Sequence, residues 1–234
     1  MTTVREGPPL KVLTSNSQRG VLAALGPEFQ RSTGFELSIS YDPAQVMLRR
    51  IAAGETADVA ILSRAAIDTL TAQGKIESAG RRLLGRCGAG IAVKSGAVKP
   101  DIASVDTLRR ALLEVKSIIF TSEGASGLHF ATVIEQLGIA AAIRAKAHQQ
   151  PGGLVASRVA SGEVEMAVQQ IPELLAVAGV DLVGPLPEPV QAYSMVTGGI
   201  FANSKHRDAA QLLLAFLVTP EAKRVFCAAG LDPG

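Results

Sequence analysis

Two hydrophobic patterns alternate along almost the whole chain: short apolar runs, and longer stretches in which apolar residues recur every three or four positions. The first pattern predicts β-strands and the second predicts amphipathic helices. The predicted strands cover residues 10–14, 35–41, 58–62, 90–94, 117–120, 165–170, 181–183 and the apolar stretch 193–202. The predicted helices cover residues 18–31, 43–51, 65–73, 106–115, 128–137, 153–160, 172–177, 207–218 and 220–228. Strands and helices in alternation predict an α/β fold with mainly parallel sheets.

Several residues predict where these elements begin, end and bury their side chains. Gly34 follows the first helix as a C-cap would. Asp42 and Pro43 are typical of the N-cap and first residue of the second helix. The strand 58–62 is apolar throughout, which predicts that both of its faces are buried.

The α/β pattern occurs twice along the chain, although the sequence itself shows no internal repeat. We therefore expect two lobes, each a mainly parallel sheet flanked by helices, with the ligand cleft between them. Residues 1–88 and 195–234 are predicted to form lobe I, and residues 89–194 to form lobe II. The crossovers between them are expected near 86–94 and 192–200.

Composition narrows the class of protein. The 234 residues, 47% of them hydrophobic, are enough to bury a core and exclude intrinsic disorder. The 23 Lys and Arg against 21 Asp and Glu leave a net charge of +2, so nucleic acid is not expected as a partner. No apolar run approaches the roughly 20 residues that span a bilayer, so no membrane span is predicted.

The few cysteines and histidines give no sign of a metal site. Cys87 and Cys227 are too few for a disulfide framework, and we expect both to be buried as small apolar side chains. His129, His148 and His206 lack the spacing of zinc ligands. We therefore expect no metal.

Motifs of the common hydrolases and nucleotide enzymes are missing as well. The chain has no G-x-S-x-G, no G-x-G-x-x-G after its first strand, and no lysine in the small-residue loop 124–127 that would make it a phosphate loop. We expect no cofactor. Glu123 and His129 could form an acid–base pair, although a solvated glutamate and a structural histidine are the favoured interpretation.

Polar residues follow the predicted strands and precede the predicted helices in both halves of the chain. A helix N-terminus offers unpaired N–H groups and the positive end of the dipole to an anion. Ligands of open α/β sheets bind where the carboxyl ends of strands meet. Each residue alone also fits an ordinary N-cap, but their recurrence favours an anion site. The candidates are Ser15, Asn16, Ser17, Ala44, Gln45, Ser63, Arg64, Ser122, Ser126 and Gly127.

Two neutral amides, Gln169 and Gln170, end the strand 165–170. They offer directed donors to a carboxylate or oxyanion without the cost of burying a charge. Strand alternation predicts that only one of them faces the cleft. A polar strand end exposed to water is the alternative interpretation. Arg64 likewise either neutralises the ligand or is hydrated at the surface.

The order and spacing of several segments resemble the type II periplasmic solute-binding proteins, in the molybdate-binding-like branch of ABC-transporter binding proteins. The segments that carry this resemblance are 15–17, 25–34, 48–61, 160–167 and 209–222. The resemblance implies a two-lobed fold that closes on an oxyanion held by neutral donors, with an ABC permease as a partner. By position, the donors it implies are Ser15, Ser17, Ser63 and Ser126.

Two departures argue against molybdate or tungstate as the ligand. The segment 43–45 is Pro-Ala-Gln where molybdate binders are rich in serine, and Gln170 stands where they tend to have tyrosine. The segments 169–174 and 179–187 are similar instead to a subgroup of substrate-binding proteins related to aconitate isomerases. Such an enzyme needs a base and carboxylate-binding donors, for which Glu123, His129 and Arg64 are the candidates.

The sequence thus predicts a monomeric binding protein that closes around a small carboxylate or other oxyanion. The alternatives are a cofactor-free isomerase of an unsaturated tricarboxylate and, third, a ligand-sensing domain. Residues 1–9 contain no apolar segment of a signal peptide. A protein with a trimmed leader belongs in the periplasm and one without a leader in the cytoplasm, and we favour the cytoplasm.

Overall fold

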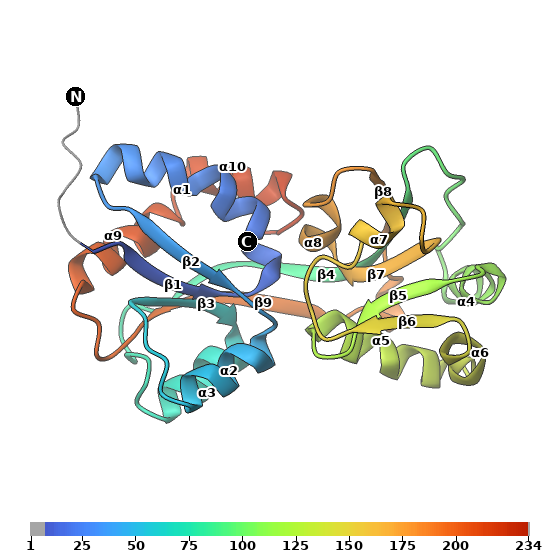
Figure 1. Cartoon of the computed structure of the whole chain (residues 1–234), viewed down its shortest axis with the longest axis horizontal. Helices are drawn as coiled ribbons and strands as arrows, with labels where there is room; N and C mark the ends of the chain where they lie inside the picture. Colours follow the sequence, from blue (N-terminus) through green and yellow to red (C-terminus); the bar gives the residue numbers. More distant parts are fainter. Residues whose placement is uncertain (1–7, 234) are drawn as a thin grey trace. The chain divides into compact units, whose positions relative to one another are not determined.

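The structure is a computed structural model that describes residues 8–233 (Figure 1). Its strands are β1 Leu10–Thr14, β2 Leu37–Tyr41, β3 Val59–Ser63, β4 Arg82–Lys94, β5 Ile118–Thr121, β6 Ala147–Gln150, β7 Met166–Gln170, β8 Val180–Pro185 and β9 Tyr193–Ile200. Its helices are α1 Arg19–Thr33, α2 Ala44–Ala52, α3 Arg64–Ala72, α4 Val105–Glu114, α5 Ala125–Gln136, α6 Ala140–Arg144, α7 Ser157–Ala160, α8 Ile171–Leu175, α9 Arg207–Phe216 and α10 Pro220–Ala228, with 3₁₀ turns η1 Asn16–Gln18 and η2 Glu188–Val190. The interpretation of residues 1–9 as lacking a signal peptide falls mostly on residues 1–7, outside the described residues.

The chain folds into two compact units. Unit 1 holds the described residues up to Arg86 and those from Ser194 onward, whereas unit 2 holds Cys87–Tyr193. The chain passes from unit 1 to unit 2 within β4 and returns at the start of β9.

In unit 1 the strands follow the order β2-β1-β3-β9. β1 is parallel to both of its neighbours, with Thr14 opposite Tyr41 on β2 and Ile61 on β3, and β9 runs antiparallel to β3. The carboxyl ends of β1, β2 and β3 therefore share one edge of the sheet, which we call the unit 1 edge. Helices α1 and α10 cover one face of this sheet, and α2 and α3 cover the other (Figure 1).

In unit 2 the strands follow the order β4-β7-β5-β6, and β8 also pairs with β4. β5 is parallel to β6 and β7, whereas β4 is antiparallel to β7 and β8. The carboxyl ends of β5, β6 and β7 thus share one edge, which we call the unit 2 edge. Both units therefore present the ends of parallel strands, where ligands of α/β sheets bind.

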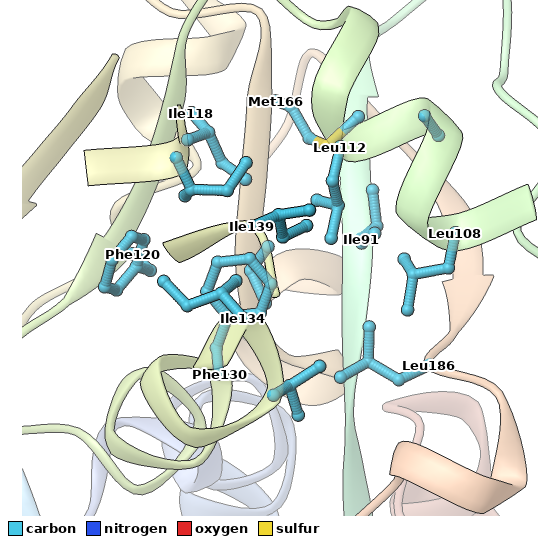
Figure 2. Close-up of a cluster of buried hydrophobic side chains, with 14 of the residues drawn as sticks. Ile91, Leu108, Leu112, Ile118, Phe120, Phe130, Ile134, Ile139, Met166 and Leu186 are labelled. Carbon is cyan, nitrogen blue, oxygen red and sulfur yellow. The ribbon is translucent and has the colours of Figure 1, made fainter. Parts of the chain in front are cut away.

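The sheet of unit 2 buries side chains on both faces. Phe120 and Phe130 meet edge to face with ring centroids 5.1 Å apart, in a cluster that also holds Ile91 and Met166 (Figure 2). Ile119, one residue from Phe120, belongs instead to the cluster against α7 and α8. The alternation of side chains along β5 therefore supplies both cores, which explains why its first three residues are all apolar.

Most elements lie where the apolar pattern placed them. β1 and α10 have the predicted bounds, and Val59–Leu62 of β3 are fully buried, as predicted. Gly34 ends α1 in the left-handed conformation, with φ of 77° and its N–H donating to the Gln30 carbonyl.

The start of α2 differs from the prediction. The N-cap is Pro43, without a side-chain hydrogen bond, and Asp42 lies outside the helix. The Asp42 carboxylate pairs with Arg50, eight residues further along the chain. The prediction of Asp42 as N-cap was wrong because this ion pair holds its carboxylate away from the N–H groups of the first turn.

The start of α5 also differs. The helix begins at Ala125 with Gly124 as N-cap, three residues before the predicted start. Ser126 and Gly127 therefore lie in its first turn, and the prediction that they precede the helix was wrong. The apolar period begins only at Leu128 because the preceding residues are small and pack closely against the end of β5.

Two further differences concern polar or short segments. Of the predicted helix 153–160 only α7 is helical, because the Gln169 amide binds the backbone of Gly153 and Val155 and holds them in a loop. β6 and α6 were not predicted, since Ala147–Gln150 is too polar to show a strand pattern. None of the helices within residues 8–233 is both long and apolar enough to cross a bilayer.

Candidate functional site

The end of β1 is fixed to β3 by two hydrogen bonds. The buried Thr14 hydroxyl and the Ser15 N–H both donate to the Ile61 carbonyl, at 2.9 and 3.2 Å. The chain then turns through η1, whose three residues are all buried. Ser15 and Ser17 face each other with their hydroxyl oxygens 2.9 Å apart. The predicted polar loop is thus an ordered turn at the unit 1 edge.

Arg19, the first residue of α1, places a cation beside this turn. Its Nη2 donates to Asn16 Oδ1 at 3.3 Å, and its guanidinium carbon lies 4.2 Å from the centre of the Tyr41 ring. Its Nε is buried and has no hydrogen-bond partner among the described residues. A buried donor without a partner is costly, so a ligand oxygen at this position would complete the arginine's hydrogen bonding.

Tyr41 ends β2 and supports the arginine. Burial raises the pKa of its phenol, and the Arg19 charge only partly opposes this shift, so Tyr41 is neutral at physiological pH. A neutral ring under a guanidinium forms a cation–π contact and holds the cation in place. Sequence reasoning missed both residues, because their contact depends on the pairing of β1 with β2.

The other candidates of unit 1 lie along α2 and α3. Ala44 and Gln45 are in the first turn of α2, with Gln45 exposed. Ser63 caps α3 through a hydrogen bond from Ala66 N–H at 3.4 Å. Arg64 is exposed and lines a pocket of about 340 Å3 with Asp68, Arg81, Leu83 and Thr197.

The unit 2 edge is built around Thr121, the last residue of β5. Its buried hydroxyl has no hydrogen-bond partner among the described residues. A Cβ on Gly124 would lie 2.3 Å from this hydroxyl, and one on Gly127 would lie 1.7 Å from the Thr121 carbonyl oxygen. These glycines therefore let the first turn of α5 approach the strand end. Its N–H groups and the Thr121 hydroxyl are donors of the kind that bind anions.

The two serines near the end of β5, Ser122 and Ser126, differ in their exposure to solvent. Ser122 is exposed, and its N–H donates to the Gln150 carbonyl. Ser126 is buried in the first turn of α5.

The two glutamines at the end of β7 have separate environments. Gln169 is buried, its oxygen accepting from Val155 N–H at 3.1 Å and its nitrogen donating to the Gly153 carbonyl at 2.6 Å. Gln170 is half-buried, and its side-chain oxygen accepts from the Cys87 thiol at 2.9 Å. Gln169 therefore supports a loop, and Gln170 is the amide that remains at the edge.

Glu173 is a further functional candidate that sequence reasoning missed. Its Oε2 accepts from Gln170 N–H at 3.3 Å, which brings the carboxyl back to the end of β7. Burial raises its pKa to about 8, although hydrogen bonds from Gln170 and Gln169 oppose the shift. Its position inside the motif 169–174 was the only signal in the sequence.

Cys87 and Cys227 have opposite environments. Cys87 is buried, as predicted; burial and the nearby Glu173 raise its pKa to about 12, so it is a thiol and not a nucleophile. Cys227 is exposed, so its predicted burial was wrong. The buried positions of α10 are Ala222 and Phe226, four residues apart, and Cys227 follows on the outer face.

The acid–base pair considered from the sequence stays a prediction. His129 Nε2 donates to the Val190 carbonyl at 2.8 Å, which ties α5 to η2. Glu123 is half-buried in the loop before α5, where its N–H donates to the Pro151 carbonyl. Among residues 8–233, no three His, Cys, Asp or Glu side chains gather closely enough to hold a metal ion.

A family model of bacterial extracellular solute-binding proteins matches residues 10–232. The chain belongs to this family. An aconitate isomerase from Pseudomonas sp. is 32% identical over 230 residues, which cover 96% of this chain and 87% of the relative. The resemblance predicted from the sequence, including its subgroup, is thereby confirmed.

Solved structures show that this solute-binding protein has the fold of periplasmic binding proteins, as predicted. The periplasmic molybdate-binding protein of Azotobacter vinelandii superposes with a TM-score of 0.79 at 18% identity, over 95% of this chain and 98% of that one. The sulfate-binding protein of Mycobacterium tuberculosis gives a TM-score of 0.76 at 21% identity, over 97% and 87%. At these identities the likeness concerns the fold alone.

Proposed function

We propose that this solute-binding protein binds a small anion with several carboxylates, through polar groups at the carboxyl ends of its parallel strands. The observation that carries the proposal is Arg19, a half-buried cation at the start of α1 whose Nε has no hydrogen-bond partner among residues 8–233. On the unit 2 edge, the Thr121 hydroxyl and the first turn of α5 offer neutral donors. An ABC permease stays the expected partner of a protein with this function.

A carboxylate suits this arginine better than a tetrahedral oxyanion does. The guanidinium presents its donors in one plane, which matches the two oxygens of a carboxylate. Its plane is set by the Tyr41 ring and by the bond to Asn16. The molybdate and sulfate proteins share the fold of this chain, and their ligands are therefore competitors to be tested.

Binding will be measured by thermal shift and calorimetry with citrate, cis-aconitate, trans-aconitate, sulfate and molybdate. A ligand that binds the folded state raises the melting temperature. We expect the tricarboxylates to do so and the inorganic anions to have no effect. Replacement of Arg19 by Met should weaken tricarboxylate binding at least tenfold, about 1.4 kcal/mol or more, because a charge-assisted bidentate contact is lost.

Arg31→Met provides a matched control, since Arg31 is an exposed arginine of the same helix. It should bind tricarboxylates as the wild type does. A preference for molybdate or sulfate, or unchanged binding by Arg19→Met, would contradict the proposal.

As a second function, we propose that the protein interconverts isomers of an unsaturated tricarboxylate. The aconitate isomerase at 32% identity over nearly the whole chain favours it. The reaction is a proton shift along three carbons and requires a base but no redox partner. Incubation with cis- or trans-aconitate, followed by chromatographic separation of the isomers, tests it directly.

A further inference from the structure

A pocket of about 340 Å3 lies at the start of α3, within unit 1. Three segments of the chain line it. Arg64 and Asp68 come from the first turns of α3, Arg81 and Leu83 from the chain around the start of β4, and Thr197 from β9. Pockets of about 300–1,000 Å3 hold small molecules, so this one suits a small ligand.

Thr197 points from β9 towards α3. A Cβ on Gly199, two residues further along the strand, would meet Ile67 of α3. A Cβ on Gly198 would instead meet Leu214 of α9. Side chains alternate along a strand, so Thr197 faces the same way as Gly199. The antiparallel pairing of β9 with β3 also places Thr197 beside the end of β3, where α3 begins.

The hydroxyl of Thr197 has no hydrogen-bond partner. The residue is only 7% exposed, and no group among residues 8–233 bonds to its Oγ1. A buried hydroxyl without a partner is costly, whereas valine has nearly the same shape and avoids this cost. A ligand oxygen in the pocket would supply the partner that the fold does not.

The charged side chains of the pocket leave one guanidinium unpaired. Arg81 binds Asp68, with Nη1 and Oδ1 2.7 Å apart. The side chain of Arg64 forms no ion pair or hydrogen bond within the described part of the chain, although Asp68 lies one helical turn further along α3. The N-terminus of α3 adds the positive end of its dipole. The pocket therefore has one surplus positive charge.

The groups around this charge favour a carboxylate over an inorganic oxyanion. A guanidinium presents its donors in one plane, which matches the two oxygens of a carboxylate, and the Thr197 hydroxyl can donate to one of them. Leu83 is 42% exposed and offers an apolar surface to a carbon chain. One surplus charge also suits a monocarboxylate better than a divalent anion.

This pocket lies apart from Arg19. The Arg19 guanidinium stacks on Tyr41, which ends β2. In the order β2-β1-β3-β9, Thr197 is three strands from β2, which is about 14 Å at the usual strand spacing. α1, which begins with Arg19, and α3, which begins with Arg64, cover opposite faces of the sheet (Figure 1). A ligand in the pocket therefore leaves Arg19 free for another.

We propose that unit 1 binds a small monocarboxylate with a short carbon chain in the pocket at the start of α3. Arg64 and Thr197 hold the carboxylate, and Leu83 contacts the chain. The ion pair of Arg81 with Asp68 forms a polar wall beside them. This site is additional to the polycarboxylate function proposed above and does not depend on it.

Butyrate is the probe, and calorimetric titration and saturation-transfer NMR measure its binding. The wild type should bind it saturably at one site. Arg64→Met should weaken binding at least tenfold, and Arg64→Lys should weaken it less, because lysine keeps the charge but lacks the planar donors. Arg31→Met, which removes an exposed arginine from α1 of the same unit, is the matched control and should bind butyrate as the wild type does.

Thr197→Val separates a ligand from a structural residue. It should weaken butyrate binding at least threefold without lowering the melting temperature of the unliganded protein, because valine fills the same space and has no hydroxyl to satisfy. A lower melting temperature would show that the hydroxyl has a structural partner, and would overturn its role as a ligand.

Four further results decide the proposal. Absence of butyrate binding by the wild type, or unchanged binding by Arg64→Met, overturns it. Binding of phosphate or sulfate in place of butyrate overturns the carboxylate class. Displacement of butyrate by saturating citrate overturns the separate pocket, whereas simultaneous binding supports it. None of these results decides whether citrate binds through Arg19, which Arg19→Met tests.

Discussion

Two glycines determine whether the unit 2 edge can form. Gly124 and Gly127 let the first turn of α5 pack directly on Thr121, because any Cβ at either position would overlap the threonine. The close approach leaves the Thr121 hydroxyl buried without a partner among the described residues. This geometry is therefore set by the absence of side chains at two positions.

Gly127→Ala should destabilise the protein by about 1–3 kcal/mol, since its Cβ would lie 1.7 Å from a backbone oxygen that cannot move aside. Gly26→Ala is the contrasting variant. Gly26 lies inside α1, where a Cβ would meet only Leu37 Cδ1 at 3.7 Å, so alanine should stabilise the protein by up to about 1 kcal/mol. Denaturant unfolding of both variants checks the pair, and equal effects would refute this account of Gly127.

Single residues also mark the limit of what the sequence could predict. Ser15 and Ser17 were found because they follow an apolar run, which is a local signal. Arg19 and Glu173 were missed because their properties arise from tertiary contacts: the arginine from the ring of Tyr41, and the carboxyl from burial at the end of β7. An arginine or glutamate in the first turn of a helix shows nothing of this in sequence.

At the scale of elements, Arg50 holds α2 in place from both ends. Its guanidinium binds Asp42 before the helix, Glu55 after it, and the Ser40 hydroxyl on β2. The hydrogen bond to Arg50 lowers the pKa of Glu55, although burial opposes the shift. One side chain thus joins a strand, a helix start and a helix end.

Arg50→Met should lower the free energy of unfolding by about 1–2 kcal/mol, because several charge-assisted bonds are lost from a half-exposed site. The reduction should be smaller at low pH, where the carboxylates are protonated. Arg224→Met removes a single exposed pair with Glu221 and should change stability by less than about 0.5 kcal/mol. Denaturant unfolding measures both variants. Similar losses of stability would contradict the role of Arg50 in holding both ends of α2.

The predictability of the elements followed their burial. β3 and β5 are buried and apolar except at their last residues, and both were placed to within one residue. β6, with the sequence Ala-His-Gln-Gln, is half-exposed and lies at the end of the strand order next to β5, so its side chains carry no hydrophobic pattern. Pairing by backbone hydrogen bonds leaves no trace in the sequence, and such strands are missed.

At the scale of the whole molecule, one carboxyl makes stability depend on pH. The pKa of Glu173 is about 8 in the folded protein, against an ordinary value of 4.5. Between these values the folded state holds a proton that the unfolded state has lost, so this group's contribution to stability falls as pH rises from about 4.5 to about 8.

Glu173→Gln should therefore be more stable than the wild type at pH 8 and should lose this advantage towards pH 5. The difference in free energy should grow by at most about 1.4 kcal/mol per pH unit, which is the limit for one proton. Melting temperatures of both proteins across this range provide the measurement. A constant difference would mean that Glu173 is ionised in the folded state.

The order of motifs along the whole chain was more informative than any one of them. Segments such as 25–34 and 48–61 are individually loose, yet their succession predicted the family and the fold that the comparisons confirm. The order of motifs does not identify the ligand, because proteins of one fold bind different anions through a few side chains.

The contrast between the two cysteines has a practical consequence. The chain contains only Cys87 and Cys227, the first a buried thiol and the second on the outer surface of α10. A maleimide dye should therefore attach to the wild-type protein at one position. The wild-type protein can thus be tethered or labelled at a defined point without any engineered residue.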